Sequence, residues 1–513
     1  MNNNSIGNKI FHGTLVIVFI GVIAKFASFI SEVVLAAYLG TTAQSDAYYT
    51  VFSIHGVIYP MMSIGIWKVF LPLYKSHIAK EEYPAAFSLT NKALSFFTII
   101  SCVIVTMLVF LAPLVVTIVA PGFKSETREL CIKLVRISAP QYVFIIASAV
   151  YASILQCHDK FVGSQIREVA SHIPVIIAAI FFYKTFGIEA MAVSLVVAGF
   201  LRLLVELPFV TWGYKFKPNI KFKNKDFALM LKRLPSALVS AGVTQLNTLV
   251  DKAMASMLQA GAISGLNYGH KLMNVFSGLL SSAIATAMYP QMIELISLNK
   301  KEELGKLIVK IINIFCVMMV PITFACILFR TEFVSAAFQR GAFDANSTLL
   351  TANVFALYSI GLFFIACNTV ISNIFYGYGD TKTAMYISVM YLVINILLNI
   401  VFIYLWGING LALATSLSAI ITFFVRLEMI KKYVRLKRKP MMVTGVKVSA
   451  AAGIACMIPR GIFWFYPANN YLIITVSAII GAFAYLFLAK IIFHVSEIDE
   501  LMLFLRRKLK RNE

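Results

Sequence analysis

The sequence has little charge and no catalytic signature. Only 13% of its 513 residues are charged and 60% are hydrophobic; a soluble protein of this length could not bury so much apolar surface. It contains no Walker A loop, no HExxH zinc motif and no nucleophile elbow. The seven cysteines are scattered without CxxC or cysteine–histidine spacing, which favours small buried side chains over metal ligands. We therefore expect no enzyme.

Long apolar runs are the main feature present. They recur along the whole chain, each close to the ~20 residues that a helix needs to cross a ~30 Å hydrocarbon core. The pattern predicts an all-α polytopic membrane protein with about fourteen transmembrane helices. We expect these helices near residues 10–38, 46–78, 86–118, 130–157, 166–184, 186–212, 228–258, 262–296, 303–330, 349–377, 383–405, 409–432, 442–466 and 470–495.

The basic residues that give the net charge of +22 lie mainly in the loops. Basic residues concentrate in alternate connections, which hold roughly five times as many Lys and Arg as the others, as the positive-inside rule describes. The largest groups lie at 215–233 and 426–439. This distribution predicts that both termini are cytoplasmic, and it accounts for the basic charge without a nucleic acid partner.

The chain also repeats itself. Leu35–Tyr49 (LAAYLGTTAQSDAYY) resembles Met254–Tyr268 (MASMLQAGAISGLNY), 219 residues further on (254 minus 35). Two shorter segments, 120–123 and 158–160, match 340–343 and 379–382 in the same order. Because that spacing covers an even number of helices, we expect two parallel six-helix lobes. The predicted organisation is an N-lobe at 1–212, a basic cytoplasmic linker at 213–227, a C-lobe at 228–432, two extra helices at 433–495 and an amphipathic basic cytoplasmic tail at 496–513.

Some charged residues fall inside the expected helices, where they usually face a cavity or a partner. Lys25 and Glu32 are seven residues apart and share one helix face, Asp251 ends a polar stripe, and Lys271 lies in the following helix. We predict that these four line a polar cavity.

Other polar residues have simpler structural explanations. Lys68, Lys252 and Arg202 lie near helix ends, where long side chains can extend to the headgroups. Glu206 follows Arg202 by one turn and is its predicted ion-pair partner. Asn247 and Asn395 could equally join neighbouring helices.

Several segments resemble one family. They are Ala36–Phe52 (AAYLGTTAQSDAYYTVF), Gln245–Met257 (QLNTLVDKAMASM), Ile263–Met273 (ISGLNYGHKLM), Phe338–Phe343 (FQRGAF), Phe375–Thr383 (FYGYGDTKT) and Gly410–Leu417 (GLALATSL). In this order they resemble the MurJ/MviN lipid II flippases, a branch of the multidrug/oligosaccharidyl-lipid/polysaccharide exporter superfamily. The resemblance extends over the first twelve expected helices and the extra pair.

The resemblance implies the carriage of an undecaprenyl-pyrophosphate-linked sugar from the inner to the outer leaflet by alternating access. Members hold the pyrophosphate with basic residues, which here correspond to Lys25 and Lys271; Ser31 and Tyr59 stand where the family has arginine. Asp46 matches the family's acid. We therefore predict Lys25, Glu32, Asp46 and Lys271 as substrate-binding residues, with a weaker grip on pyrophosphate because lysine offers no bidentate fork.

The same resemblance implies a sodium site in some members. Its residues here are Asp251, Asn395, Asn399, Leu411 (through its carbonyl) and Thr415. Asn399 replaces an acid, so we expect weak sodium binding and transport that depends chiefly on membrane potential.

The sequence thus predicts a monomeric flippase of the bacterial cytoplasmic membrane, with lipid II for peptidoglycan synthesis as its substrate and no cofactor except a possible sodium ion. An exopolysaccharide or teichoic-type lipid-linked oligosaccharide is the alternative substrate. A drug/cation antiporter is disfavoured by the cavity lysines, and a membrane glycosyltransferase by the lack of a long loop.

Overall fold

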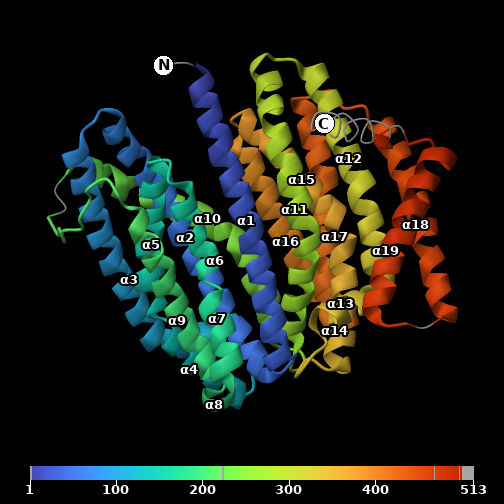
Figure 1. Cartoon of the computed structure of the whole chain (residues 1–513), viewed down its shortest axis with the longest axis horizontal. Coiled ribbons are helices and arrows are strands. Elements are labelled where there is room, and N and C mark those ends of the chain that lie inside the picture. Colours follow the sequence, from blue (N-terminus) through green and yellow to red (C-terminus); the bar gives the residue numbers. More distant parts are fainter. Residues whose placement is uncertain (1–2, 222–223, 467, 496, 499–513) are drawn as a thin grey trace. The chain divides into compact units, whose positions relative to one another are not determined.

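The computed structural model describes residues 3–221, 224–466, 468–495 and 497–498 (Figure 1). Across this described part, every regular element is a helix. The predicted amphipathic tail at 496–513 lies outside the described residues apart from Glu497 and Ile498. The chain divides into two compact units, Met1–Ser264 and Gly265–Glu513.

The first unit is built from the N-terminal helices. They are α1 (Asn3–Leu39), α2 (Ala43–Ala79), α3 (Tyr83–Val119), α4 (Ser125–Ser138), α5 (Gln141–Cys157), α6 (Phe161–Ala170), α7 (Ile173–Ile177), a π-helical turn (Ala178–Phe182), α8 (Tyr183–Phe186), α9 (Glu189–Leu204), a 3-10 turn (Leu207–Phe209), α10 (Lys225–Ala255) and the first residues of α11 (Ala262–Ser297). Helix α10 packs along α2 in this unit.

The second unit continues from α11. It holds α12 (Lys301–Leu328), α13 (Arg330–Phe338), α14 (Ala345–Ile360), α15 (Leu362–Gly377), α16 (Thr381–Trp406), α17 (Ile408–Met429), a 3-10 turn (Ile430–Lys432), α18 (Arg438–Phe465), α19 (Asn470–Phe487) and a π-helical turn (Leu488–Ile492).

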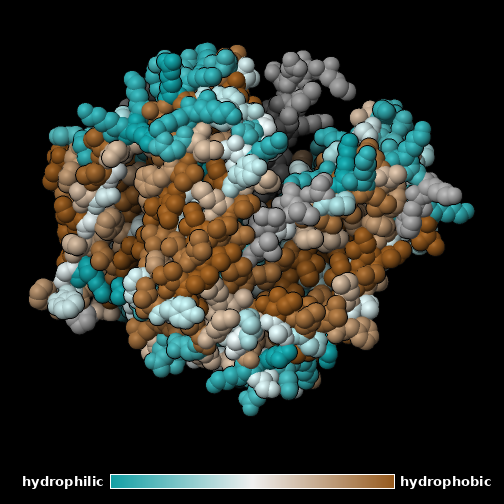
Figure 2. Space-filling model, turned by 180° about the vertical axis from the view of Figure 1, so that it is seen from behind, coloured by the Kyte–Doolittle hydropathy of each residue, from teal (hydrophilic) through white to brown (hydrophobic). Residues whose placement is uncertain are grey.

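The number and the apolar character of the helices are those of a multi-pass membrane protein. Among the described residues, ten helices are long and apolar enough to cross a bilayer, or twelve if two bent pairs each count as one span. On the face drawn in Figure 2, hydrophobic residues cover the middle and hydrophilic residues gather towards the helix ends. Helices occupy all the predicted positions, but α10 and α11 are not among the candidate spans. A count of fourteen spans stays a prediction.

Two expected spans are bent, which the sequence pattern did not predict. The α4–α5 pair bends by 47° at Pro140, and the α14–α15 pair bends by 43° at Gly361. Proline has no N–H to continue the helical hydrogen bonds. At Gly361 the backbone N–H donates to Ser416 Oγ at 3.1 Å, and a Cβ would lie 2.9 Å from that oxygen. Glycine therefore permits the close approach of α17 at this bend.

The helix boundaries recur along the chain. The bent pairs cover 125–157 and 345–377, so both ends are 220 residues apart (345 minus 125; 377 minus 157). The next spans, Phe161–Phe186 and Thr381–Trp406, have the same offset (381 minus 161). Each is followed by a left-handed glycine, Gly187 at φ +60° and Gly407 at φ +55°. The repetition extends to backbone geometry.

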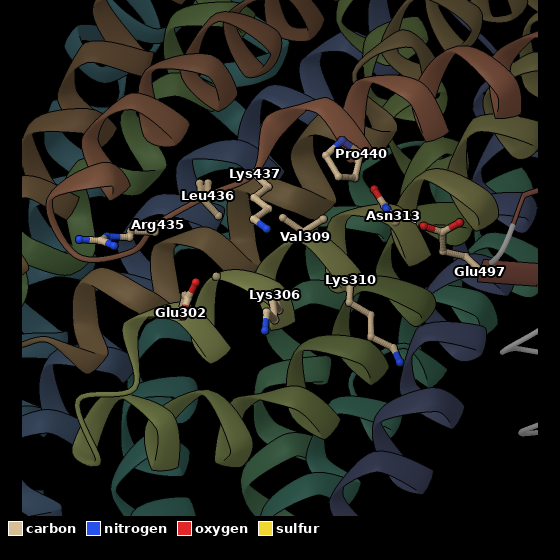
Figure 3. A pocket seen from close by; sticks show the side chains of 11 residues that line it. Glu302, Lys306, Val309, Lys310, Asn313, Arg435, Leu436, Lys437, Pro440 and Glu497 are labelled. Atoms are coloured by element: carbon tan, nitrogen blue, oxygen red, sulfur yellow. Dashed lines mark hydrogen bonds between the residues drawn. The ribbon is translucent and has the colours of Figure 1, made fainter.

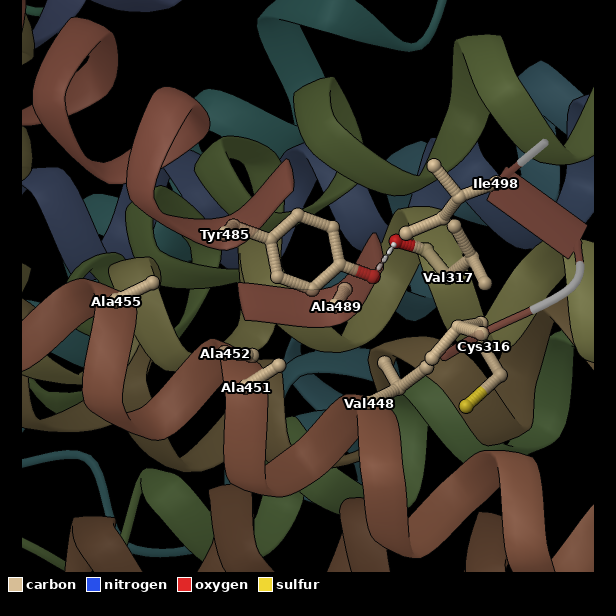
Figure 4. Close-up of a cluster of buried hydrophobic side chains, with 10 residues drawn as sticks. Cys316, Val317, Val448, Ala451, Ala452, Ala455, Tyr485, Ala489 and Ile498 are labelled. Atoms are coloured by element: carbon tan, nitrogen blue, oxygen red, sulfur yellow. Dashed lines mark hydrogen bonds between the residues drawn. The ribbon is translucent and has the colours of Figure 1, made fainter. Parts of the chain in front are cut away.

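In the second unit, α18 and α19 pack against each other, and α18 also packs against α12 (Figure 4). Helix α18 presents the small residues Ala451, Ala452 and Ala455 to this contact, which allows a close helix approach. Tyr485 of α19 donates its hydroxyl to the Val317 carbonyl of α12 at 2.9 Å. The C-terminal helix pair is therefore attached to α12 through a buried core.

Candidate functional site

Asp46 lies in the first turn of α2, and its side chain holds the start of α11. Oδ2 accepts from the Gly261 N–H at 2.7 Å, and Oδ1 accepts from the N–H and the hydroxyl of Ser264, each at 2.8 Å. A carboxylate at a helix N-terminus satisfies donors that have no partner within the helix. The Asp46 side chain is 4% exposed, and both of its oxygens are engaged by the protein. This geometry supports a positioning role.

Gly261 is needed for this contact. Its φ of +90° lies in the left-handed region, and a Cβ there would be 2.5 Å from the Thr41 carbonyl oxygen. The turn before α11 therefore lies directly on the α1–α2 connection.

A second polar group joins α1, α2 and α10. The Tyr49 hydroxyl donates to Glu32 Oε2 at 2.7 Å. Lys252 of α10 donates to the Tyr49 carbonyl at 3.2 Å and to the Ser53 hydroxyl. Glu32 and Lys252 are both buried, so Glu32 holds a tyrosine rather than lying open to solvent. The expectation that Lys252 extends to the headgroups was wrong, because the buried Lys252 side chain donates its hydrogen bonds to α2.

A cluster of four charged side chains connects α6 and α9. Arg202 forms an ion pair with Glu168, and Arg167 lies 3.6 Å from both Glu168 Oε1 and Glu206 Oε1. The predicted Arg202–Glu206 pair is thus replaced by Arg202–Glu168, because α6 brings an acid from across the helix contact. The Arg202 guanidinium carbon also lies 4.5 Å from the centre of the Tyr59 ring. A cation therefore stands beside the position where the resemblance expects an arginine.

The asparagines of the predicted sodium site come together in the second unit. Asn399 Nδ2 donates to Asn395 Oδ1 at 3.0 Å, Asn395 Nδ2 donates to Thr415 Oγ1 at 3.4 Å, and Thr415 Oγ1 donates to the Leu411 carbonyl at 3.2 Å. Both asparagines are fully buried. Oxygen donors of this kind suit a hard cation, but all four groups are neutral.

Asp251, the fifth predicted ligand, belongs to the first unit. Asn247 Nδ2 donates to its Oδ2 at 3.5 Å. Within the described ranges no three or more His, Cys, Asp or Glu side chains form a group that could hold a metal ion. Sodium binding by these residues stays a prediction.

The two predicted cationic anchors also lie in different units. Lys25 is exposed on α1 in the first unit, and Lys271 is half-buried on α11 in the second. The structure does not test their role, which stays a prediction.

The Asp380 motif caps a helix. Asp380 accepts from the Thr383 N–H at 3.1 Å, from the Thr383 hydroxyl at 2.7 Å and from the Tyr433 hydroxyl. These donors stabilise the charged form, and with the Tyr433 hydrogen bond as the largest cause they lower the pKa of Asp380 to about 2. The segment Phe375–Thr383 therefore leads from α15 into α16, and Asp380 ties the start of α16 to Tyr433, which follows the 3-10 turn after α17.

Comparison with known proteins identifies the family. A family model described as lipid II flippase MurJ matches residues 35–483. The chain belongs to the MurJ family. A probable lipid II flippase MurJ of Rickettsia prowazekii is 25% identical over 483 residues, covering 91% of this chain and 94% of the relative. The corresponding protein of Thermotoga maritima is 24% identical over 490 residues, covering 93% and 96%.

Solved structures agree on the fold. A lipid II flippase MurJ in an inward closed conformation has a TM-score of 0.80 at 22% identity, with 93% of this chain and 99% of that chain covered. An inward-facing multidrug resistance transporter of the MATE family has a TM-score of 0.67 at 14% identity, covering 80% and 95%. The chain therefore has the MurJ fold, and the MATE-family structure has a similar fold.

Sequence reasoning missed three contributors to the polar groups of this MurJ-family chain. Tyr49, Ser53 and Glu168 carry no signal by type or spacing, since their partners are on other helices. Lys252 offered one clue, because its neighbour Asp251 already occupies the polar stripe and adjacent helix positions face about 100° apart.

Proposed function

We propose that this chain carries lipid II, the undecaprenyl-pyrophosphate-linked peptidoglycan precursor, from the inner to the outer leaflet by alternating access. The family match over 35–483 is the observation that carries the proposal. The many apolar spans support it, because the work must be done within the bilayer. The family is one of transporters, and the proposed role requires no bond-forming chemistry and no nucleic acid.

The proposed arrangement is a monomer in the bacterial cytoplasmic membrane with fourteen spans and both termini cytoplasmic. Two six-helix lobes, at 1–212 and 228–432, precede the extra pair at 433–495. Support comes from the basic loops and from the boundaries that recur 220 residues apart (345 minus 125).

In the proposed mechanism Lys25 and Lys271 attract the pyrophosphate. Each offers a point charge without a bidentate fork, so the complex depends on charge more than on geometry. Glu32 and Asp46 act one step removed: Glu32 orients Tyr49, and Asp46 holds the start of the helix that carries Lys271.

A weakly bound sodium ion is proposed as the coupling ion. Asn395, Asn399, the Leu411 carbonyl and Thr415 would supply neutral oxygens, and the resemblance adds Asp251. With one carboxylate in the set, the membrane potential acting on the cavity lysines is proposed as the larger driving force, at about 2.3 kcal/mol per charge per 100 mV.

The test replaces the resident flippase of a bacterium with this chain. On depletion of the resident protein, the chain should restore growth and lipid II translocation, and so should Lys271→Arg. Lys271→Ala should fail while reaching the membrane in normal amount. Lys382→Ala, which removes an exposed lysine at the start of α16, is the matched control and should remain active.

Restored polysaccharide export without restored growth would favour the alternative substrate. Full activity of a Lys25→Ala, Lys271→Ala double variant would remove both lysines from the site.

A further inference from the structure

A cavity of about 380 Å³ lies in the second unit, where α12 and α18 begin (Figure 3). One wall is a single face of α12, with lining residues three or four positions apart. The other wall is the segment that leads into α18. The lining residues are Glu302, Gly305, Lys306, Val309, Lys310, Asn313, Arg435, Leu436, Lys437, Pro440 and Glu497.

The cavity is positively charged. Four lining side chains are basic and two are acidic, which leaves a net charge of +2 (four minus two). Lys306 projects from α12, whereas Lys437 comes from the opposite wall (Figure 3). Both α12 and α18 present their N-terminal ends here, and the helix dipole adds partial positive charge at such ends. An anion is the ligand that this combination favours.

A glycine allows the two walls to lie close together. A Cβ at Gly305 would lie 2.3 Å from the Arg435 carbonyl oxygen, so a larger residue would push the segment before α18 away from α12. The basic side chains of the two walls therefore face one cavity because of backbone packing.

The inner end of the cavity holds a hydrogen-bond acceptor to which no donor in the described part of the chain is bonded. Asn313, which is 4% exposed, donates through Nδ2 to Glu497 Oε1 at 2.6 Å. A carboxylate oxygen only accepts, which fixes the amide with its nitrogen towards Glu497. Asn313 Oδ1 is then buried and has no donor among the residues that the structure describes. Such an atom calls for a ligand that donates a hydrogen bond.

We propose that this cavity binds the headgroup of an anionic phospholipid that carries free hydroxyls, of the phosphatidylglycerol type. The phosphodiester would contact Lys306, Arg435 and Lys437, and a headgroup hydroxyl would donate to Asn313 Oδ1. A soluble phosphate has the same anionic chemistry. The position favours the lipid, because α12 and α18 are both candidate spans and basic pockets between such spans bind anionic headgroups. The site does not depend on the proposed lipid II transport.

The experiment measures lipid retained by the full chain. The protein is reconstituted in vesicles of phosphatidylcholine and phosphatidylglycerol, extracted in detergent, and examined by native mass spectrometry. Lys306→Gln with Lys437→Gln should weaken phosphatidylglycerol retention by about thirtyfold, since each basic side chain near an anionic surface contributes about 1 kcal/mol. Lys300→Gln with Lys301→Gln removes the same charge from the same helix end outside the cavity and should change retention little.

Two further arms test the role of the headgroup hydroxyl and the folding of the variants. Wild-type protein should prefer phosphatidylglycerol to phosphatidylmethanol, which has the same charge but no free hydroxyl. Lys306→Arg with Lys437→Arg should retain the lipid and melt like the wild type.

Equal losses in the cavity and control variants would overturn the proposal, as would equal retention of the two anionic lipids. Displacement of the lipid by millimolar glycerol 3-phosphate would assign the cavity to a soluble phosphate and also overturn it.

Discussion

Replacing Asp46 with alanine should destabilise the first unit. The change removes the acceptor for two buried backbone N–H groups, those of Gly261 and Ser264. A buried donor without a partner costs about 1–3 kcal/mol. The Ser264 hydroxyl adds little, because the Gly261 carbonyl lies 3.2 Å away as a substitute acceptor. We expect a loss of about 2–5 kcal/mol.

Buried thiols allow this loss to be measured. Cys131 is buried with its sulfur 3.8 Å from the Ala47 carbonyl, next to Asp46, and becomes reactive when α2 separates from α4. In a Cys102→Ser background, which removes an exposed thiol, melting is followed in detergent with a thiol-reactive dye. At about 2–4 °C per kcal/mol, Asp46→Ala should lower the melting temperature by roughly 5–15 °C. The melting temperature of Asp46→Asn should lie between those of the parent and Asp46→Ala, because the asparagine side chain keeps one acceptor oxygen.

Glu129→Ala is the matched control, because it removes an exposed carboxylate of α4. Melting of Asp46→Ala within a degree of its parent would refute the positioning role. An equal drop in Glu129→Ala would attribute the effect to net charge instead.

Three further predictions concern other groups. Arg202→Gln should cost about 1–2 kcal/mol, because the Glu168 side chain is 40% exposed and keeps Arg167 at 3.6 Å, and adding Glu168→Gln should restore part of the melting temperature; additive losses would contradict a coupled pair. Asp380 has its pKa lowered from 3.8 to about 2, so its contribution to stability is complete above pH 4 and is lost as pH falls through 2. The melting advantage of wild type over Asp380→Asn should therefore shrink between pH 5 and pH 2, and an advantage that grows would reverse the sign. In proteoliposomes, collapsing the membrane potential should slow transport more than removing sodium, and Asn399→Asp should increase sodium dependence; a wild type stopped by sodium removal alone would contradict this.

The sequence was sufficient to predict where helices lie. Apolar runs near twenty residues leave few alternatives in a bilayer, so the predicted positions agree with α1 to α19. The bends at Pro140 and Gly361 were not predicted. Hydropathy averages over a window, whereas each bend depends on one residue, and Gly361 depends also on Ser416 from another helix.

The polar contacts were predicted less well. The resemblance implies Asp46 as a substrate-binding residue, and that role stays a prediction; its contacts with Gly261 and Ser264, more than two hundred residues later, were not predicted. Lys252 was expected at the membrane surface for its position near a helix end, but it contacts α2. Spacing along a helix indicates which residues share a face, and the identity of the facing helix is a tertiary property.

The arginine missing at Tyr59 illustrates the same limit. At position 59 this chain has a tyrosine where the resemblance expects an arginine, but Arg202 from α9 lies over the Tyr59 ring. That replacement restores a guanidinium without restoring net charge, since Arg202 and Arg167 are balanced by Glu168 and Glu206. A buried ion pair resists separation, because either partner alone would be left uncompensated. In the proposed mechanism the attraction for pyrophosphate therefore still rests on Lys25 and Lys271, and the weaker grip predicted from the sequence is unchanged by the structure.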